Sequence, residues 1–165
     1  ELILSIPSLL IILLLQATLG EATILSLSLV IGLTGWPGIA KVVRTEVRQI
    51  RSSGYVAAAR TMGAGFFHIL RKHLTPNFLP SILFMIVMNI RNAITAESTL
   101  SFIGVGLPLK MISWGSMLSL SEQAVMTASR WIILIPGFFL VTALLCVTNI
   151  GNYLRKNTDK RHSNL

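Results

Sequence analysis

Long apolar stretches alternate with more polar segments along the chain. Crossing the hydrocarbon core of a membrane as a helix takes about 20 mostly apolar residues, because each residue rises only about 1.5 Å through roughly 30 Å. The stretches that are long and apolar enough are 2–19, 22–40, 78–105 and 131–150. This pattern predicts an all-α fold, a polytopic membrane helical bundle with four spans. Only Gly20 and Glu21 separate the first two stretches, which predicts an antiparallel hairpin.

The charged residues gather between and after these stretches. Seven cations lie in the segment 41–76 and four in the tail 151–165, whereas the segment 106–130 carries only Lys110 and Arg130. Cytoplasmic loops of membrane proteins carry an excess of Lys and Arg. The asymmetry therefore predicts that both termini and the loop 41–76 are cytoplasmic and that 106–130 is an outer loop. The chain, 1–165, is then a single transmembrane domain.

Composition agrees with a membrane protein. Hydrophobic residues make up 53% of the chain and charged residues 12%, against roughly 25% charged in soluble domains, so a water-soluble surface cannot be assembled. The net charge of +8 indicates no nucleic-acid partner, because such an interface needs a basic face on a soluble fold. A lipid bilayer explains the cations. The apolar run begins directly after Glu1, from which we expect the chain to be part of a longer protein.

The basic segment 41–76 contains two predicted short helices. Ser52 or Ser53 can cap a helix that begins near Gly54 and includes three consecutive alanines. After the glycine hinge 63–65, apolar residues at three- and four-residue spacing predict a second helix over 66–74 that ends before the proline at 76. The alanine face fits a groove in another protein, or the segment lies as an amphipathic helix on anionic lipid. Composition alone leaves both interpretations open.

The third apolar stretch carries polar residues at membrane depth. At 100° per residue Asn89, Asn92 and Ala96 share one face with Ala93, and Glu97 flanks it. Arg91 points away from this face, and a charge at this depth needs protein or water around it. One interpretation is that the amide-bearing face lines a translocation path. The other is that it forms an interface in the helical bundle, with Arg91 bound to backbone carbonyls or to a neighbouring chain.

No arrangement of residues in the sequence is typical of a catalytic, metal or nucleotide site. There is no Gly-x-x-x-x-Gly-Lys-Ser/Thr loop to hold phosphates, so the sequence predicts no nucleotide site of this type. None of the three histidines has a carboxylate at the spacing of a zinc site or of a catalytic triad. An intramembrane enzyme would need a base near Ser98 or Ser101, and no histidine is there. We therefore predict no enzyme, no cofactor and no metal.

The segment around the three alanines resembles the cytoplasmic loop signature of permeases of binding-protein-dependent ABC importers. In that signature a glutamate precedes two alanines, and here Ala57 stands in the place of the glutamate. Thr75 replaces the usual leucine before the proline. The resemblance implies that this loop couples a permease to its ATPase. The residues that it marks for ATPase coupling are Tyr55, Ala57, Ala58, Ala59, Arg60, Gly63 and Pro76.

Further blocks in the same order are similar to the dipeptide, oligopeptide and nickel branch of this family. These blocks are 36–44, 96–106, 113–118 and 136–137. The tail departs from the family, because the acidic residues usual after the glycine at 151 are absent. Family members carry further spans upstream, so the chain resembles their C-terminal portion.

The resemblance implies a permease subunit in the bacterial cytoplasmic (inner) membrane that forms the translocation path for peptides or for nickel and other metal complexes. The implied partners are a second permease subunit, two cytoplasmic ATPase subunits and an extracytoplasmic solute-binding protein. The alternative is a truncated permease or a non-transporting membrane scaffold, because the upstream spans of the family are missing from this portion.

Overall fold

The computed structural model describes residues 5–124 and 131–162. Every regular element in these ranges is helical, which confirms the predicted all-α class. The elements in chain order are α2 (Ser8–Leu19), α3 (Ile24–Arg51), α4 (Gly54–Thr61), α5 (Phe66–Ile69), the π-helical turn η1 (Leu70–Leu74), α6 (Thr75–Ile103), α7 (Trp114–Ala124) and α8 (Trp131–His162).

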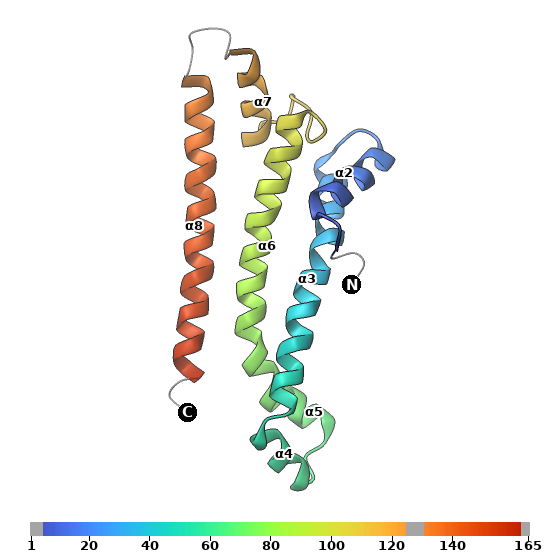
Figure 1. Cartoon of the computed structure of the whole chain (residues 1–165), viewed down its shortest axis with the longest axis vertical. Helices are drawn as coiled ribbons and strands as arrows, with labels where there is room; N and C mark the ends of the chain where they lie inside the picture. Colours follow the sequence, from blue (N-terminus) through green and yellow to red (C-terminus); the bar gives the residue numbers. More distant parts are fainter. Residues whose placement is uncertain (1–4, 125–130, 163–165) are drawn as a thin grey trace.

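Three long helices lie side by side and form the body of the molecule (Figure 1). α6 is in the middle and packs against α3 on one side and α8 on the other, while α7 covers the upper part of α6 and α8. α4 and α5 lie together at the lower end, beyond the end of α8 (Figure 1). The arrangement is that of a helical membrane bundle with one elongated end.

The described residues provide three helices long and apolar enough to cross a membrane, not the four predicted. These are Ile24–Arg51, Phe66–Ile103 and Trp131–Lys156. The predicted first span, 2–19, contains the helix α2 of only 12 residues, about 18 Å long against the roughly 30 Å of the hydrocarbon core. Pro7 stands at the N-cap of α2 with ψ 124°, an extended conformation that separates α2 from the residues before it. Residues 2–4 lie outside the described residues.

α2 and α3 form the predicted hairpin. The turn ends in a capping box, in which the Ser26 amide donates to Thr23 Oγ1 (3.1 Å) and the Thr23 amide donates to Ser26 Oγ (2.9 Å). Ile12 of α2 is buried against Leu27 and Val30 of α3 and Leu100 of α6. The capping box supplies the first amides of α3 with acceptors, and the apolar cluster holds the hairpin against α6.

The segment 41–76 is more continuously helical than the sequence predicts. α3 does not end at residue 40 but runs to Arg51. The second predicted helix does not end before Pro76 but continues through η1 into α6. Both the amide and Oγ1 of Thr75 donate to the carbonyl of Leu70, the hydroxyl at 2.9 Å. A proline inside an α-helix lacks an amide donor and clashes with the carbonyl four residues earlier, and the wider π turn directly before Pro76 lets the helix continue.

The junction between α6 and α7 is packed too closely for a side chain at Gly115. A Cβ at this position would lie 2.6 Å from the Ser98 carbonyl oxygen and 2.7 Å from Ser101 Cβ. Ser113 and Ser116 cap the start of α7 reciprocally, through Ser113 N to Ser116 Oγ (2.9 Å) and Ser116 N to Ser113 Oγ (3.1 Å). The glycine thus allows α7 to lie directly against α6.

We expect Gly115→Ala to lower the melting temperature of the purified protein in detergent, because the added methyl group meets backbone atoms that cannot move aside, at a cost of about 1–3 kcal/mol. The control is Gly137→Ala in α8, where an added Cβ would meet nothing within 4 Å and alanine improves helix propensity. Equal melting temperatures for the two variants would contradict the close packing at α7.

Candidate functional site

α4 is attached to both long helices that lead away from it. Its buried residue Val56 belongs to an apolar cluster with Ile50 of α3, Ile69 of α5 and Leu74 of η1. Partly buried residues that pack against these four are Val47, Ala64, Leu70 and Phe78. We call these eight residues the basic-end cluster. It joins α3, α4, α5, η1 and α6, so α4 is packed against both long helices that lead away from it.

Polar contacts strengthen this attachment. The Asn77 side-chain amide donates to the His73 carbonyl (2.6 Å) and to the Tyr55 hydroxyl (3.4 Å), and the rings of Tyr55 and His73 are 5.9 Å apart. Higher along the same two helices, Ser81 of α6 donates a hydrogen bond to Glu46 of α3 (2.9 Å). These contacts connect α4 to the start of α6, and α6 to α3.

The two faces of α4 differ in exposure. Val56 is fully buried and Ala59 is 6% exposed, whereas Ala57 and Ala58 are exposed. The three alanines therefore do not form one ridge, because successive residues of a helix are rotated by about 100° and Ala59 turns inward. The exposed residues among those marked for ATPase coupling are Tyr55, Ala57, Ala58, Arg60, Gly63 and Pro76.

α4 ends at a glycine that the backbone requires. Gly63 has φ +83°, and its amide donates to the Arg60 carbonyl (2.9 Å) while the Ala64 amide donates to the Ala59 carbonyl (3.0 Å). This pair of bonds is the Schellman motif that commonly ends a helix. The predicted cap at the other end is wrong: α4 begins at Gly54 as expected, but the Ser53 hydroxyl donates back to Ile50 (2.6 Å) and caps nothing.

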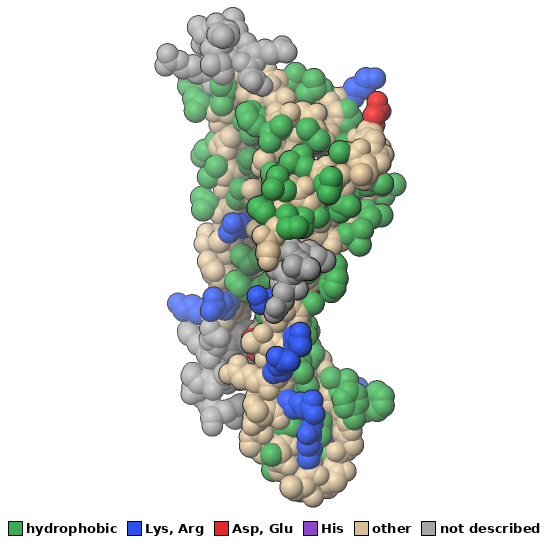
Figure 2. All heavy atoms as spheres, turned by 45° about the vertical axis from the view of Figure 1, so that its right-hand side comes forward, with side chains coloured by type: hydrophobic (Ala, Val, Ile, Leu, Met, Phe, Trp, Pro, Cys, Tyr) green, Lys and Arg blue, Asp and Glu red, His purple; other side chains and the backbone are tan. Residues whose placement is uncertain are grey.

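The cations follow the extension of α3 toward α4. Lys41, Arg44, Arg48 and Arg51 recur at three- and four-residue spacing, which puts them on one side of the helix. In Figure 2 most of the visible Lys and Arg side chains lie over the lower half of the molecule and the apolar side chains over the upper half. The steps from Lys41 to Arg51 add up to about 15 Å of helix. α4 therefore lies well beyond the apolar part of α3.

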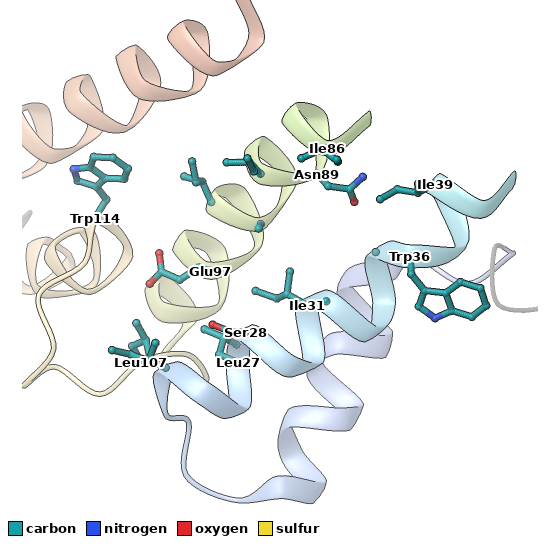
Figure 3. A pocket seen from close by; sticks show the side chains of 16 residues that line it. Leu27, Ser28, Ile31, Trp36, Ile39, Ile86, Asn89, Glu97, Leu107 and Trp114 are labelled. Atoms are coloured by element: carbon teal, nitrogen blue, oxygen red, sulfur yellow. The ribbon is translucent and has the colours of Figure 1, made fainter. Parts of the chain in front are cut away.

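A groove runs between α3 and α6 in the apolar part of the molecule (Figure 3). Its volume is about 620 Å³, within the range of roughly 300–1,000 Å³ typical of small-molecule sites. Most of its lining is apolar. The lining residues are Ile24, Leu27, Ser28, Ile31, Gly32, Gly35, Trp36, Ile39, Ile86, Asn89, Ile90, Ala93, Ile94, Glu97, Leu107 and Trp114.

The groove separates the polar residues that the sequence analysis grouped on α6. Asn89 and Glu97 line it, whereas Asn92 is exposed outside it, and Ala96 packs against the Ile12–Leu27–Val30–Leu100 cluster. Arg91 is half-buried and takes no part in the groove. The face of α6 that lines the groove is therefore rotated around the helix from the predicted face by about one residue position, roughly 100°.

The spacing of small residues along α3 also indicates which side of that helix lines the groove. On α3, Ser28, Gly32 and Gly35 recur at helical spacing and give this side of the helix small side chains. A Cβ at Gly35 would lie 2.9 Å from Asn89 Oδ1, so the glycine lets the amide reach α3. Trp114 and Leu107 come from the segment after α6, and no periodic pattern in the sequence could have located them.

Glu97 is held by hydroxyl groups. Its carboxylate accepts hydrogen bonds from Ser101 Oγ (2.8 Å) and Ser98 Oγ (3.3 Å), and Ser101 Oγ in turn accepts one from the Leu107 amide (3.0 Å). A side chain at Gly106 would collide with Ser101. Residues 104–106, directly after α6, therefore form a tight turn that brings Leu107 to the edge of the groove.

The described part of the chain contains no group of three or more His, Cys, Asp or Glu residues that could hold a metal ion. The rings of His68 and His73 are 6.0 Å apart, next to α4, and neither has a carboxylate partner among the contacts found there. The arrangement offers binding surfaces and a groove rather than reactive groups.

Comparison with known proteins identifies related sequences. A family model described as "Binding-protein-dependent transport system inner membrane component" matches residues 1–160. A putative peptide permease protein of Brucella ovis is 35% identical over 162 residues, which are 98% of this chain and 53% of the relative. The dipeptide transport system permease protein of Bacillus subtilis is 32% identical over 161 residues, 98% of this chain and 50% of the relative.

An oligopeptide transport system permease protein of Haemophilus influenzae is 33% identical over 161 residues, 98% of this chain and 51% of the relative. The chain thus spans about half the length of the curated relatives that it matches. These matches confirm the resemblance drawn from the sequence blocks and the inner-membrane location that it implied. The family is a transport component and not an enzyme, as predicted.

We expect Gly63→Ala to loosen α4, because a residue with a side chain pays roughly 1–2 kcal/mol for the left-handed conformation. Hydrogen exchange of the α4 amides should become about tenfold faster. Gly65→Ala is the matched control, since Gly65 has φ −69° and open space around its Cβ position. An equal effect of both substitutions would show that the φ angle of Gly63 does not hold the helix end.

Proposed function

Because the chain belongs to the family of binding-protein-dependent transport system inner membrane components, we propose that it forms part of the permease of an ABC importer and lines a translocation path for peptides. The observation that carries this proposal is the mechanical connection of α4 through the basic-end cluster to α3 and α6, the two helices that wall the groove. A motor that moves α4 changes the groove.

The orientation follows from the charges. The end that carries Lys41 to Arg51 and α4 is the cytoplasmic end, and the turn 104–113 with the start of α7 faces outward. Two ATPase subunits lie on the cytoplasmic side, and one of them binds the exposed face of α4. A second permease subunit completes the path in the membrane, and a solute-binding protein delivers the substrate from outside.

The position of α4 favours a protein partner over lipid. An amphipathic helix on a membrane surface buries its apolar face by about 5–10 Å into the headgroup region. In α4, Val56 and Ala59 are buried within the protein instead, while Tyr55, Ala57 and Ala58 are exposed, and about 15 Å of charged helix separates α4 from the apolar part of α3. Its exposed alanine face is left for a partner in solution.

Peptides are the proposed substrates, because the relatives compared above are named as peptide, dipeptide and oligopeptide permeases. The groove suits peptides chemically. Its apolar walls accept varied peptide side chains, and its few polar groups can bind the peptide main chain. Nickel complexes, the other substrates that the sequence resemblance implies, are not in the names of the relatives compared above.

Crosslinking tests the coupling role. In a Cys146→Ala background within the complete importer, Ala58→Cys should form an adduct with the ATPase that changes when nucleotide binds. Ala59→Cys is the matched control, because residue 59 faces the interior at 6% exposure and should not react. No adduct from position 58, or equal adducts from both positions, would argue for a scaffold without ATPase coupling.

A pair of substitutions on α6 tests the path. We expect Asn89→Leu to lower peptide uptake several-fold at an unchanged amount of assembled complex, because it removes the central amide from the groove. Asn92→Leu, less than one turn away but outside the groove, should leave uptake near the wild-type rate. The reverse order of effects would place the path on another face of α6.

A further inference from the structure

Glu97 is the charged residue of the α3–α6 groove. Among the lining residues described above, it alone carries a formal charge, and the groove around it is formed by residues such as Ile94, Leu27 and Trp114 (Figure 3). Charged side chains within membrane-spanning segments are costly and usually face a partner or a path. A carboxylate at this position therefore calls for an explanation.

The contacts of Glu97 leave acceptor capacity free. A carboxylate can accept about four hydrogen bonds, and Ser98 and Ser101 supply two. No described Lys or Arg side chain forms an ion pair with it. Arg91 lies on the same helix but six positions earlier, about 240° around the axis. The remaining acceptor sites are complementary to a small cation that donates hydrogen bonds.

The position of Glu97 matches the outer part of a path. It lies six residues before the end of α6 at Ile103, about 9 Å along the helix, and at the end opposite to α4. From there the groove continues along α6 past Ala93 and Ile90 to Asn89, with mostly apolar walls. A ligand that binds Glu97 by a cationic group would extend its apolar part along these walls.

We propose that Glu97 binds the α-ammonium group of a peptide as it enters the groove. This inference rests on the proposed function. The α-ammonium group donates three hydrogen bonds and is largely charged at neutral pH, because its ordinary pKa is about 8. Every peptide with a free amino terminus carries it, whatever its side chains. A divalent metal ion fits less well, since Glu97 is the single acidic ligand of the described groove.

A purely structural role makes a different prediction. Through Ser101 the carboxylate also holds the Leu107 amide and the turn after α6. Glu97→Gln keeps an oxygen that accepts from Ser101 but removes the charge. The turn should therefore stay intact in this variant, at a melting temperature equal to that of the wild type. A change in peptide binding at an unchanged melting temperature then reports the charge and not the support of the turn.

The test measures the binding of two probes, dialanine and N-acetyl-dialanine, to the purified complete importer. The importer is held in lipid nanodiscs without its solute-binding protein. Binding is measured once with nucleotide and once without it. We expect the wild type to bind dialanine about tenfold more tightly than the acetylated probe in one of the two states, which corresponds to one charge-assisted hydrogen bond. Glu97→Gln should abolish this preference at an unchanged melting temperature.

Two results would overturn the ammonium site: a wild type that binds both probes equally, or a preference that survives Glu97→Gln. Loss of the preference together with a lowered melting temperature in Glu97→Gln would also overturn it, in favour of a structural role. Uptake of a mixed peptide pool is measured with the same wild-type importer and its solute-binding protein. An importer that takes up no peptide would contradict the proposed function. An importer that takes up peptides but binds dialanine and N-acetyl-dialanine equally would contradict the ammonium site alone.

Discussion

The burial of Val56 in the basic-end cluster is the contact on which the rest of the structure depends. α4 has only eight residues, too few for a stable isolated helix in water, so its conformation comes from packing. Val56 meets side chains from α3, α5 and η1 at one point. Without this contact α4 would be a loop attached at two ends. With this contact, α4 is a helix packed against α3 and α6, the two helices that form the groove.

Two continuous helical stretches connect the basic-end cluster to the groove. α3 carries its helical hydrogen bonding past the apolar residues to Arg51, and the stretch Phe66–Ile103 runs through a proline by way of one π turn. Helices transmit displacement along their axes because every turn is hydrogen-bonded to the next. The same helix α6 thus carries Phe78 of the basic-end cluster and, further along, Asn89 and Glu97, which line the groove. The π turn is itself part of the cluster, through Leu70 and Leu74.

At the other end, a polar network fixes the groove. Ser101 is hydrogen-bonded both to Glu97 and to the Leu107 amide, and Gly115 lets α7 lie directly on this turn. Buried hydroxyl and amide groups must be satisfied to be tolerated in an apolar setting. The serine that donates to Glu97 therefore also holds the turn after α6, which follows the left-handed Gly104 at the end of the helix.

The sequence by itself determined the all-α membrane class, the hairpin of α2 and α3, the start of α4 at Gly54 and its end at Gly63, because apolar length, turn residues and a left-handed glycine are local properties. Tertiary structure decided what local patterns cannot specify. Pro76 reads as a helix end, but the π turn before it removes the clash. Residues 57–59 read as one ridge, but Val56 packs against Ile50 and Ile69, and Ala59, three residues later on the same face of α4, is buried with it. The groove face of α6 is set by its contact with α3, since a helix with apolar residues all round has no preferred side until a neighbour covers one.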